Sequence, residues 1–402
     1  MKFSKSSQLI LVSAIGLILA SFLTACNLVT IDYVFVAASA GSSSGSAGQI
    51  YTYAVDASSG ALRTAASPVD SGGSGPIALA TTSDFYNLYV ANQGNNSVVH
   101  FAIDNHGNLI KKDSVTLVNV PVSIAVNAAG TYLYVVSGTA SATLTEYALS
   151  SGAIGSATAT LSLTVPGFTG DIVVPTGVTV LANSNAVYVT AYDKSAYNPG
   201  GITTSNANPG WLYGYAVGSG GAMTAVSGSP YQAGVKPSAL ATDPVSRFVY
   251  VTDFASNQLI GYTVLSTDAL QFMINGPFRT GNEPTSIVID PRGIFIYLSN
   301  SLDETVSAYS IALPTGTPSA DVSVTGTAAT TTDTDPVSII VDPALGRFVY
   351  TANYLGNSVS GFKLNPSDGT IEQTQATPYP TGANPRALIA IPHGNHALST
   401  PQ

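Results

Sequence analysis

A pattern of short apolar segments recurs along the chain, and each copy opens with a proline. The clearest copy, "PVSIIVDPALGRFVYTAN" at 336–353, places two apolar segments on either side of an Asp-Pro turn. Within the segments β-branched and aromatic residues alternate with small ones, which is typical of pleated, half-buried strands. The pattern therefore predicts two antiparallel strands joined by a tight turn.

The opening prolines recur at a mean interval of 51.5 residues, and periods of this size indicate propellers or solenoids. They are Pro76, Pro121, Pro175, Pro237, Pro284, Pro336 and Pro385. The second place after each proline holds a small residue: Ala78, Ser123, Gly177, Ala239, Ser286, Ser338 and Ala387. The third place holds an aliphatic one: Leu79, Ile124, Val178, Leu240, Ile287, Ile339 and Leu388. One strand is thus repeated along the whole chain.

Two further strands of each unit carry an aromatic residue at a fixed place. In the second strand these are Phe35, Tyr89, Tyr134, Tyr188, Tyr250, Tyr297 and Tyr350. In the third strand they are Tyr53, Phe101, Tyr147, Tyr215, Tyr262, Tyr309 and Phe362. A Gly-containing turn usually follows, as in "DASSGAL" at 56–62, and a fourth strand ends the unit.

The two ends of the repeat array complete each other. The unit beginning at Asp32 lacks an opening strand, whereas "NPRALIAI" at 384–391 is an opening strand with nothing after it. Insertion of this last strand into the first unit would close a ring and protect its sheet edges, which an open solenoid would leave exposed. We expect an all-β, seven-bladed β-propeller of four-stranded blades over 32–391, followed by a disordered tail at 392–402.

The N-terminal segment is a separate object with the pattern of an export signal. Lys2 and Lys5 precede an uncharged apolar run, Leu9 to Phe22, and small residues follow. The run is shorter than the roughly 18 to 20 residues of a transmembrane helix, the alternative interpretation. "LTAC" at 23–26 resembles the lipobox of bacterial lipoproteins. The resemblance implies a signal peptide at 1–25, a diacylglycerol on Cys26 and a tether at 26–31, and Asn27 then favours the outer membrane of a two-membrane cell.

Composition and charge exclude several classes of function. Only 9% of the residues are charged, against roughly 25% in ordinary soluble proteins, and the net charge of −9 disfavours nucleic acid as a partner. Cys26 is the only cysteine, so no disulfide is expected. We also expect no cofactor and no metal, since "TDTD" at 332–335 lacks the remaining oxygen ligands of a calcium loop. A monomer is expected.

The segments "FVYVTD", "FVYTAN" and "NLYVAN" resemble those of YVTN-repeat and lactonase-family propellers, which include the 6-phosphogluconolactonase type. The resemblance implies hydrolysis of sugar lactones by His, Arg and Glu side chains at the channel, commonly with a His just after an opening proline. Here those places hold Ile77, Val122, Thr176, Ser238, Thr285, Val337 and Arg386. Because no histidine matches, the family's catalytic residues cannot be transferred to this chain.

Position in the repeat predicts a candidate site instead. In a propeller the loops before the first strands and after the second strands surround the channel on one face. The residues before the prolines are Gly75, Val120, Val174, Lys236, Glu283, Asp335 and Asn384, and those ending the second strands are Ala38, Asn92, Ser137, Ala191, Asp253, Asn300 and Asn353. Polar groups that converge beside an apolar wall are typical of small-ligand sites, although loop ends are often polar without a function.

We therefore expect the ligand site on the side of blades five to seven, formed by Lys236, Asp253, Glu283, Asn300, Asp335, Asn353 and Arg386. The long loop at 191–210 adds Tyr192 and Tyr197 and is either a lid or a disordered insertion.

Two functions of different class remain open. The first is a lipid-anchored binding or interaction module that holds a small polar molecule, a glycan or a protein segment at the channel mouth and meets the membrane only through its anchor. The alternative is a lactone hydrolase without the usual histidine. In that case Glu283 or Asp335 would activate water, and Lys236 or Arg386 would stabilise the developing oxyanion.

Overall fold

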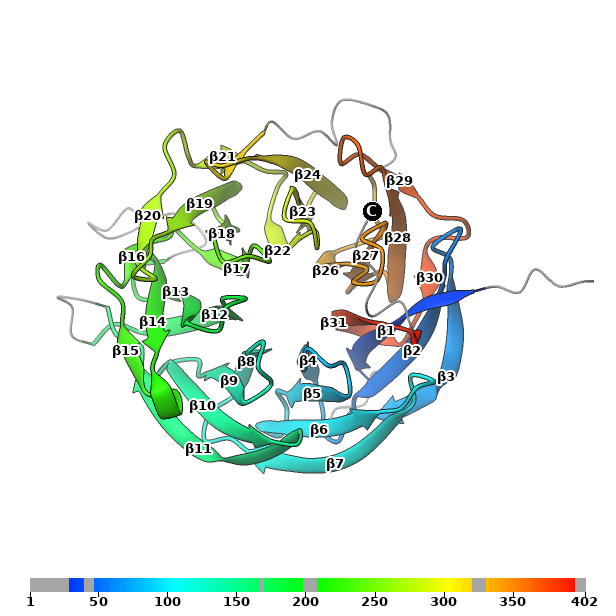
Figure 1. Cartoon of the computed structure of the whole chain (residues 1–402), viewed down its shortest axis with the longest axis horizontal. Helices are drawn as coiled ribbons and strands as arrows, with labels where there is room; N and C mark the ends of the chain where they lie inside the picture. The colour runs from blue at the N-terminus through cyan, green and yellow to red at the C-terminus, as the bar shows by residue number, and fades with distance from the viewer. Residues whose placement is uncertain (1–28, 40–46, 166–169, 198–207, 320–329, 395–402) are drawn as a thin grey trace, which may run out of the picture.

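The computed structural model describes residues 29–39, 47–165, 170–197, 208–319 and 330–394. The expected signal peptide, Cys26, residues 198–207 of the long loop and most of the expected tail lie outside these ranges. Seven antiparallel sheets stand around a central axis (Figure 1). The prediction of an all-β propeller is therefore confirmed, and the one helical element in the described ranges is a 3₁₀ turn at Ser219–Gly221.

The strands of each blade follow one another from the channel outward. The first blade consists of β31 (Ala383–Pro392), β1 (Thr30–Ser39), β2 (Gln49–Asp56) and β3 (Leu62–Asp70). The second consists of β4 (Pro76–Thr81), β5 (Asn87–Asn92), β6 (Ser97–Ile103) and β7 (Leu109–Thr116). The third consists of β8 (Pro121–Val126), β9 (Tyr132–Ser137), β10 (Thr143–Ser150) and β11 (Ala153–Ser162).

In most of the later blades the fourth strand is made of two short pieces. The fourth blade consists of β12 (Val173–Val180), β13 (Ala186–Asp193), β14 (Gly210–Val217), β15 (Met223–Ala225) and β16 (Tyr231–Gln232). The fifth consists of β17 (Pro237–Thr242), β18 (Phe248–Asp253), β19 (Gln258–Val264), β20 (Leu270–Phe272) and β21 (Phe278–Arg279). The sixth consists of β22 (Pro284–Ile289), β23 (Phe295–Asn300), β24 (Thr305–Ala312) and β25 (Thr317–Pro318). The seventh consists of β26 (Pro336–Val341), β27 (Phe348–Asn353), β28 (Ser358–Leu364), β29 (Ile371–Gln373) and β30 (Tyr379–Pro380).

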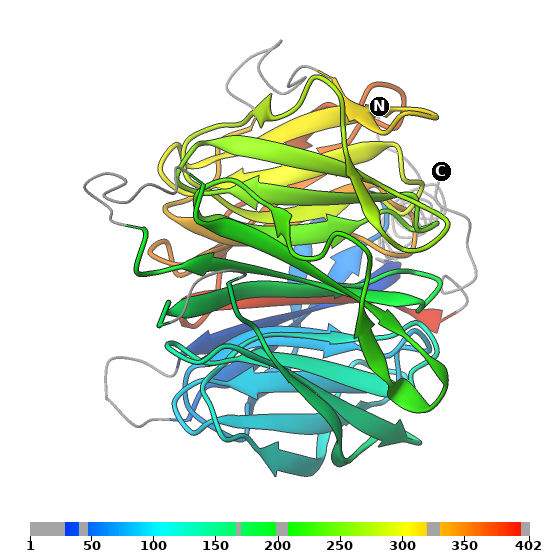
Figure 2. The same cartoon turned by 90° about the vertical axis from the view of Figure 1, so that its left-hand side faces the viewer.

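The ring closes as predicted, by insertion of the C-terminal strand. β31 pairs antiparallel with β1 in a register that runs from Tyr33 opposite Ile391 to Ala37 opposite Ala387. Figure 2 shows the two strands side by side, although they come from opposite ends of the chain. We call the interface between the seventh and first blades the closing seam.

The repeated aromatic residues form the core between blades. The six tyrosines of the second strands are fully buried, and five of them donate their hydroxyl to a carbonyl in the hairpin between the third and fourth strands of the next blade. Tyr250, for example, bonds to Gly316 O at 2.5 Å, and Tyr350 bonds to Gly60 O at 2.7 Å across the closing seam. The aromatic repeat therefore binds each blade to the next.

Proline has a structural role at the start of the innermost strands. It lacks an N–H donor and so is tolerated as the first residue of a strand. A register shift follows immediately in six blades, between the proline and the small residue at the second place. Such a bulge redirects the extra residue, which here lies against the channel.

Candidate functional site at the channel mouth

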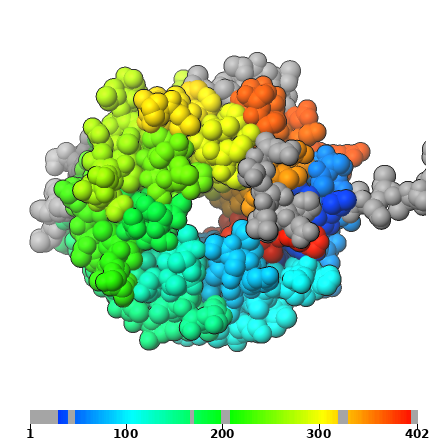
Figure 3. Space-filling model, in the orientation of Figure 1, coloured from blue at the N-terminus to red at the C-terminus, as the bar shows by residue number. Residues whose placement is uncertain are grey.

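The central channel is open along the axis of the ring (Figure 3) and has a volume of about 240 Å³. Its wall is formed by the bulged residue and its neighbours from all seven innermost strands. Arg386 is the one charged residue among those lining it. The places where the resembling family commonly carries a catalytic histidine therefore do line the channel, but here they are mainly aliphatic or hydroxylated.

The channel hydroxyls are already engaged in holding the ring together. Ser238 Oγ donates to Pro284 O at 2.6 Å, and Thr285 Oγ1 donates to Pro336 O at 2.7 Å. Each bond joins one innermost strand to the next blade. These groups consequently support the channel wall rather than offering free donors to a ligand.

Three of the sequence-predicted site residues are buried in structural roles. Asp253, Asn300 and Asn353 are each 0% exposed. The Asp253 carboxylate accepts the backbone N–H groups of Val235 and Lys236 at 2.8 and 2.9 Å, which fixes the loop before the fifth blade.

The two asparagines bond to serine hydroxyls of the third strands of their blades. Asn353 Nδ2 donates to Ser358 Oγ and Ser360 Oγ at 3.0 and 2.9 Å, and Asn300 Nδ2 donates to Ser307 Oγ at 2.9 Å. The side chains of all three residues therefore stabilise the strand ends and the loop at the mouth and are buried away from a ligand.

The other four predicted residues are partly exposed, and their charges act on one another. Burial lowers the pKa of Lys236, and the charge of Glu283 opposes this effect. Burial likewise raises the pKa of Asp335; Glu283 adds to the increase and Arg386 opposes it. The structure thus brings Lys236, Glu283, Asp335 and Arg386 into one electrostatically coupled row along the mouth.

These four charges are near one another without being paired. Within the described ranges, none of them takes part in an ion pair of 4.0 Å or less. Glu283 accepts one long hydrogen bond, from Ser301 Oγ at 3.4 Å, and the Arg386 guanidinium donates to Tyr354 Oη at 3.3 Å. Most of their hydrogen-bonding capacity is therefore not used by these contacts.

Aromatic rings flank the row at both ends. The Lys236 Nζ atom lies 4.4 Å from the ring centroid of Phe254, 5.3 Å from that of Tyr197 and 5.9 Å from that of Tyr192. The Arg386 guanidinium lies 4.9 Å from the ring centroid of Tyr354. Contacts of this kind hold a cation without neutralising it.

Sequence reasoning named Tyr192 and Tyr197 only as loop residues and missed Phe254 and Tyr354. A signal was present, because Tyr192, Phe254 and Tyr354 each follow directly the residue predicted to end a second strand.

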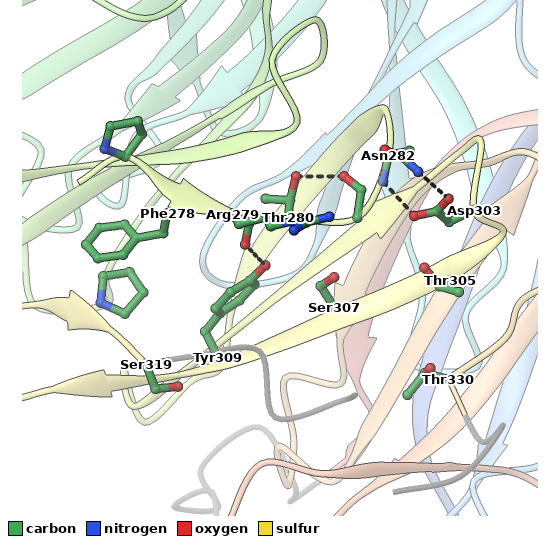
Figure 4. A pocket seen from close by; sticks show the side chains of 13 residues that line it. Phe278, Arg279, Thr280, Asn282, Asp303, Thr305, Ser307, Tyr309, Ser319 and Thr330 are labelled. Atoms are coloured by element: carbon green, nitrogen blue, oxygen red, sulfur yellow. Dashed lines mark hydrogen bonds between the residues drawn. The ribbon is translucent and has the colours of Figure 1, made fainter. Parts of the chain in front are cut away.

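A larger depression lies elsewhere, between the outer strands of the fifth and sixth blades (Figure 4). It has a volume of about 980 Å³, and Asn282 and Asp303 are bonded across one end by N–H and Nδ2 donors at 2.7 and 2.8 Å. Its rim includes Ser319 and Thr330, and residues 320–329 between them lie outside the described ranges.

The described residues offer no group of three or more His, Cys, Asp or Glu side chains that could hold a metal ion. His100 is 3% exposed and lies between Asp113 Oδ2 at 2.8 Å and Asn87 Oδ1 at 2.9 Å, and it is not among the residues that line the channel. None of the helices described is long and apolar enough to span a bilayer.

Comparison with known families agrees with this architecture. The family model described as lactonase, 7-bladed beta-propeller, matches residues 71–169 and 118–402. The chain belongs to the lactonase family. No curated protein sequence matches it significantly.

Solved structures similar to this lactonase-family chain are distant in sequence. The periplasmic gluconolactonase of Pseudomonas aeruginosa has a TM-score of 0.71 at 16% identity, with 91% of this chain and 100% of that chain covered. A candidate 6-phosphogluconolactonase from Bacteroides uniformis has a TM-score of 0.70 at 18% identity, with coverages of 90% and 100%. Hydrazine synthase of Kuenenia stuttgartiensis has a TM-score of 0.57 at 15% identity, with coverages of 80% and 93%. At these identities the likeness shows the fold, which hosts different chemistries.

Proposed function

We propose that this lactonase-family propeller binds a small polar ligand, neutral or zwitterionic, at the channel mouth. The supporting observation is the row of Lys236, Glu283, Asp335 and Arg386, whose charges are coupled but unpaired. Both signs are present, so a polyanion such as a phosphate ester would meet two carboxylates as well as two cations. The proposal also includes the end of a glycan or a protein segment that presents the same polar groups.

In this proposal aromatic rings contact the apolar part of the ligand, and charged groups bind its polar part. The rings of Tyr197 and Tyr354 lie beside the two cations and can cover an apolar face of the ligand. Glu283 and Asp335 accept hydrogen bonds from ligand hydroxyl or ammonium groups, and Arg386 donates to a ligand carbonyl or carboxylate.

Titration calorimetry with a panel of neutral and zwitterionic polar compounds, including sugar lactones, tests this proposal. For any compound that binds, Glu283→Gln and Arg386→Gln should each weaken the affinity about tenfold or more, because each removes a charged hydrogen-bonding partner. Glu372→Gln, at an exposed position of β29, is the matched control and should leave the affinity unchanged. An affinity untouched by changing both Glu283 and Arg386 would exclude the site.

A lactone hydrolase is the second candidate, and the environment of Asp335 favours it. Burial and the neighbouring Glu283 raise the pKa of Asp335, while Arg386 opposes the shift. Glu283 or Asp335 would take a proton from water as its oxygen attacks the lactone carbonyl, and Arg386 would stabilise the oxyanion. The ring C–O bond then breaks, and the leaving oxygen receives a proton to give the hydroxy acid.

Hydrolysis of glucono-1,5-lactone, corrected for the rate without protein, separates the two candidates. A hydrolase should lose its activity in Glu283→Gln or in Asp335→Asn, whichever removes the group that activates water, with unchanged melting. A binding module should show no rate above the background and only a weaker complex.

The localisation part of the proposal is export with a lipid anchor on Cys26, at the outer membrane if the cell has two membranes. It rests on the signal-like pattern at 1–25 and on "LTAC" at 23–26. Replacing Cys26 by Ser should move the protein from the membrane fraction to the soluble fraction without unfolding it. Continued partition with membranes would require another anchor.

The fold adds an orientation to this proposal. β1 begins at Thr30 and runs toward Ala38, which lies at the mouth end of the second-strand ring, so Thr30 is at the opposite end of the blade. The residues from Cys26 to Thr30 can span at most about 14 Å. An anchor at Cys26 would thus place the opposite face toward the membrane and leave the mouth open to the surrounding compartment.

A further inference from the structure

Two buried carboxyl groups meet at the closing seam. Asp32 lies in β1 opposite Pro392 of β31, and Asp342 directly follows β26 in the seventh blade. Both residues are 0% exposed. Burial is the largest cause of a raised pKa at Asp32, and the charge and the hydrogen-bonding position of Asp342 are the next causes. Ile31, next to Asp32, packs in one buried cluster with Ala344 and Phe348 of the chain after Asp342, so the seam brings the two acids near each other.

The hydrogen bonds around Asp342 suit an ionised carboxylate. Its two oxygens accept four backbone N–H groups of the turn between β26 and β27, those of Leu345, Gly346, Arg347 and Phe348. Asp342 therefore closes this turn as an acceptor, and a proton on it would remove acceptor capacity that the turn uses.

Asp32 has the opposite environment. Within the described ranges neither of its oxygens accepts a hydrogen bond, and neither aspartate takes part in an ion pair. An ionised Asp32 would be a second buried negative charge beside Asp342, which is very costly. A protonated Asp32 instead carries an O–H donor, for which the Asp342 carboxylate is the neighbouring acceptor.

The other titratable groups around the pair come from every neighbouring element. Burial raises the pKa of Tyr350 in β27, and the charges of Asp342 and Asp32 raise it further. Tyr379 of β30 and Asp56 at the end of β2 also raise the pKa of Tyr350. Tyr53 of β2 belongs to the same buried cluster. The remaining groups are Arg347, in the Asp342 turn, and His393, whose N–H bonds to Ile31 O at 2.7 Å. The seam carboxyls are thus surrounded mainly by tyrosines and by a further aspartate.

In the corresponding turns of two other blades, an arginine neutralises the buried aspartate. Asp243 and Asp290 are also 0% exposed, but their Oδ2 atoms accept Arg247 Nε and Arg292 Nε, each at 2.7 Å. The seam is where an aspartate of this repeat meets a second carboxyl group in place of a guanidinium.

We propose that Asp32 and Asp342 share one proton and that this proton is a pH-sensitive latch on the closing seam. When the proton leaves, two negative charges remain buried between the seventh and first blades, and the seam is weakened. The same strands reach the candidate site, since Asp335 directly precedes β26 and Arg386 lies in β31. Weakening the seam therefore loosens the position of Arg386 relative to Asp335, a consequence for ligands that rests on the proposed function.

The direction of the pH effect follows from the raised pKa of Asp32 in the folded chain. Above about pH 4 an unfolded chain releases this proton, whereas the folded chain keeps it. Stability therefore falls as pH rises, by up to tenfold in the unfolding equilibrium constant per pH unit, until the pH passes the folded-state pKa of Asp32. Above that pH the effect is constant.

Urea unfolding of the purified full chain between about pH 4 and 9 tests the latch. Asp32→Asn imitates the protonated acid, since it carries no charge. We therefore take the ratio of the unfolding constant of the unsubstituted chain to that of Asp32→Asn, in which the titration of all other groups cancels. This ratio should rise with pH, by up to tenfold per unit, and then level off. Asp290→Asn is the matched control: it should destabilise the fold, because it leaves the Arg292 guanidinium unpaired.

Several outcomes would overturn the proposal. A ratio that stays constant over the whole range means that no proton is held at Asp32. Stabilisation of the unsubstituted chain, but not of Asp32→Asn, by added Ca²⁺ or K⁺ means that a cation and not a proton occupies the pair. If Asp32→Asn does not fold, Asp32→Leu replaces it with the same expectation, since it also removes the titrating group.

Hydrogen exchange locates the effect without any ligand. After correction for intrinsic base catalysis, amides of β1 and β31 should exchange faster at high pH in the unsubstituted chain and not in Asp32→Asn. Equal acceleration in all seven blades would show that the pair does not act on the seam. Because neither measurement uses the mouth, failure of the proposed ligand site would leave the result unaffected.

Discussion

The interface between the fifth and sixth blades and the closing seam are built from the same side chains at the same repeat positions. Between the fifth and sixth blades, Tyr250 bonds to Gly316 O and Tyr309 bonds back to Arg279 O at 2.5 and 2.8 Å. Across the seam, Tyr350 bonds to Gly60 O and Tyr53 bonds back to Pro380 O, both at 2.7 Å.

The two interfaces differ in how the chain crosses them and in their buried charges. The fifth blade continues directly into the sixth, whereas the chain that crosses the seam from β30 supplies only β31 to the first blade, and β1 is joined to β31 by strand pairing alone. The aspartate of the adjoining turn is neutralised by Arg247 or Arg292 in the fifth and sixth blades, but faces Asp32 at the seam. The repeat therefore supplies similar packing at these two interfaces, and the seam differs from the other one by β31 and the carboxyl pair.

The largest test of this comparison removes β31. Ending the chain at Asn384 leaves the β1 edge unpaired and uncovers Val34 and Val36, which pack in the same core cluster as Leu388 and Ala390. We expect aggregation or loss of the cooperative melting transition, measured by size-exclusion chromatography and circular dichroism. Ending the chain at Gly394 removes only residues outside the described ranges and is the control. Unchanged melting after the longer deletion would contradict closure by β31.

The next test places a methyl group in both interfaces. Gly60 has φ +68°, and a Cβ there would lie 2.3 Å from Phe348 Cδ1; Gly316 has φ +77°, and its Cβ would lie 2.4 Å from Phe248 Cδ1. Replacing either by Ala should cost roughly 2 to 5 kcal/mol, from the left-handed backbone and from overpacking. Equal losses in urea unfolding would show that the two interfaces are packed alike.

The control for these substitutions is Gly220→Ala. Gly220 has φ +75°, but no atom lies within 4 Å of the place that a Cβ would take, so it isolates the backbone term, roughly 1 to 2 kcal/mol. A loss at Gly60 no larger than this control would mean that Phe348 moves aside at the seam.

The repeat made the blades and their closure predictable because their causes are local. A proline, a small residue and an aliphatic residue mark each innermost strand, and the unmatched strand at 384–391 indicated how the ring closes. The site was predictable only in part. The repeat gives the position of Asp253 and Asn353 along a strand, but not that their side chains turn inward to bond loop backbone and serine hydroxyls.

The missed features differ in how far apart their residues lie in the chain. Lys236 and Phe254 flank the paired ends of β17 and β18, where the N–H of Phe254 donates to Lys236 O at 2.9 Å, so this contact lies within one repeat. Asp32 and Asp342 come from opposite ends of the chain and are brought near each other by the closure of the ring through β31. The second contact does not follow from the spacing of residues within a repeat.

Removing a hydroxyl from each interface is a smaller test. Tyr350→Phe and Tyr250→Phe keep the buried rings and lose one hydrogen bond each, to Gly60 O and Gly316 O. We expect about 1 to 2 kcal/mol lower stability in urea unfolding for each, since a buried carbonyl loses its partner. The first blade already carries Phe35 at this place. A much larger loss at Tyr350 than at Tyr250 would mean that the two interfaces depend on this bond to different extents.

The smallest effect is expected from the serines that link neighbouring innermost strands. Ser338 Oγ accepts the N–H of Leu388 across the closing seam, and Ser286 Oγ accepts the N–H of Ile339 between the sixth and seventh blades, both at 3.3 Å. Bonds of this length are weak, and Ala78 and Ala239 occupy the same place in other blades. Ser338→Ala and Ser286→Ala should therefore lower global stability by only about 0.5 kcal/mol each.

Hydrogen exchange resolves what global unfolding cannot, because the amides of Leu388 and Ile339 lose their acceptors individually. If the seam is locally weaker than the other interface, Leu388 should lose more protection than Ile339, and the difference should grow with pH as the Asp32 proton leaves. Equal losses at all pH values would show that the seam is not locally weaker than the interface between the sixth and seventh blades and that the Asp32 proton does not act on it.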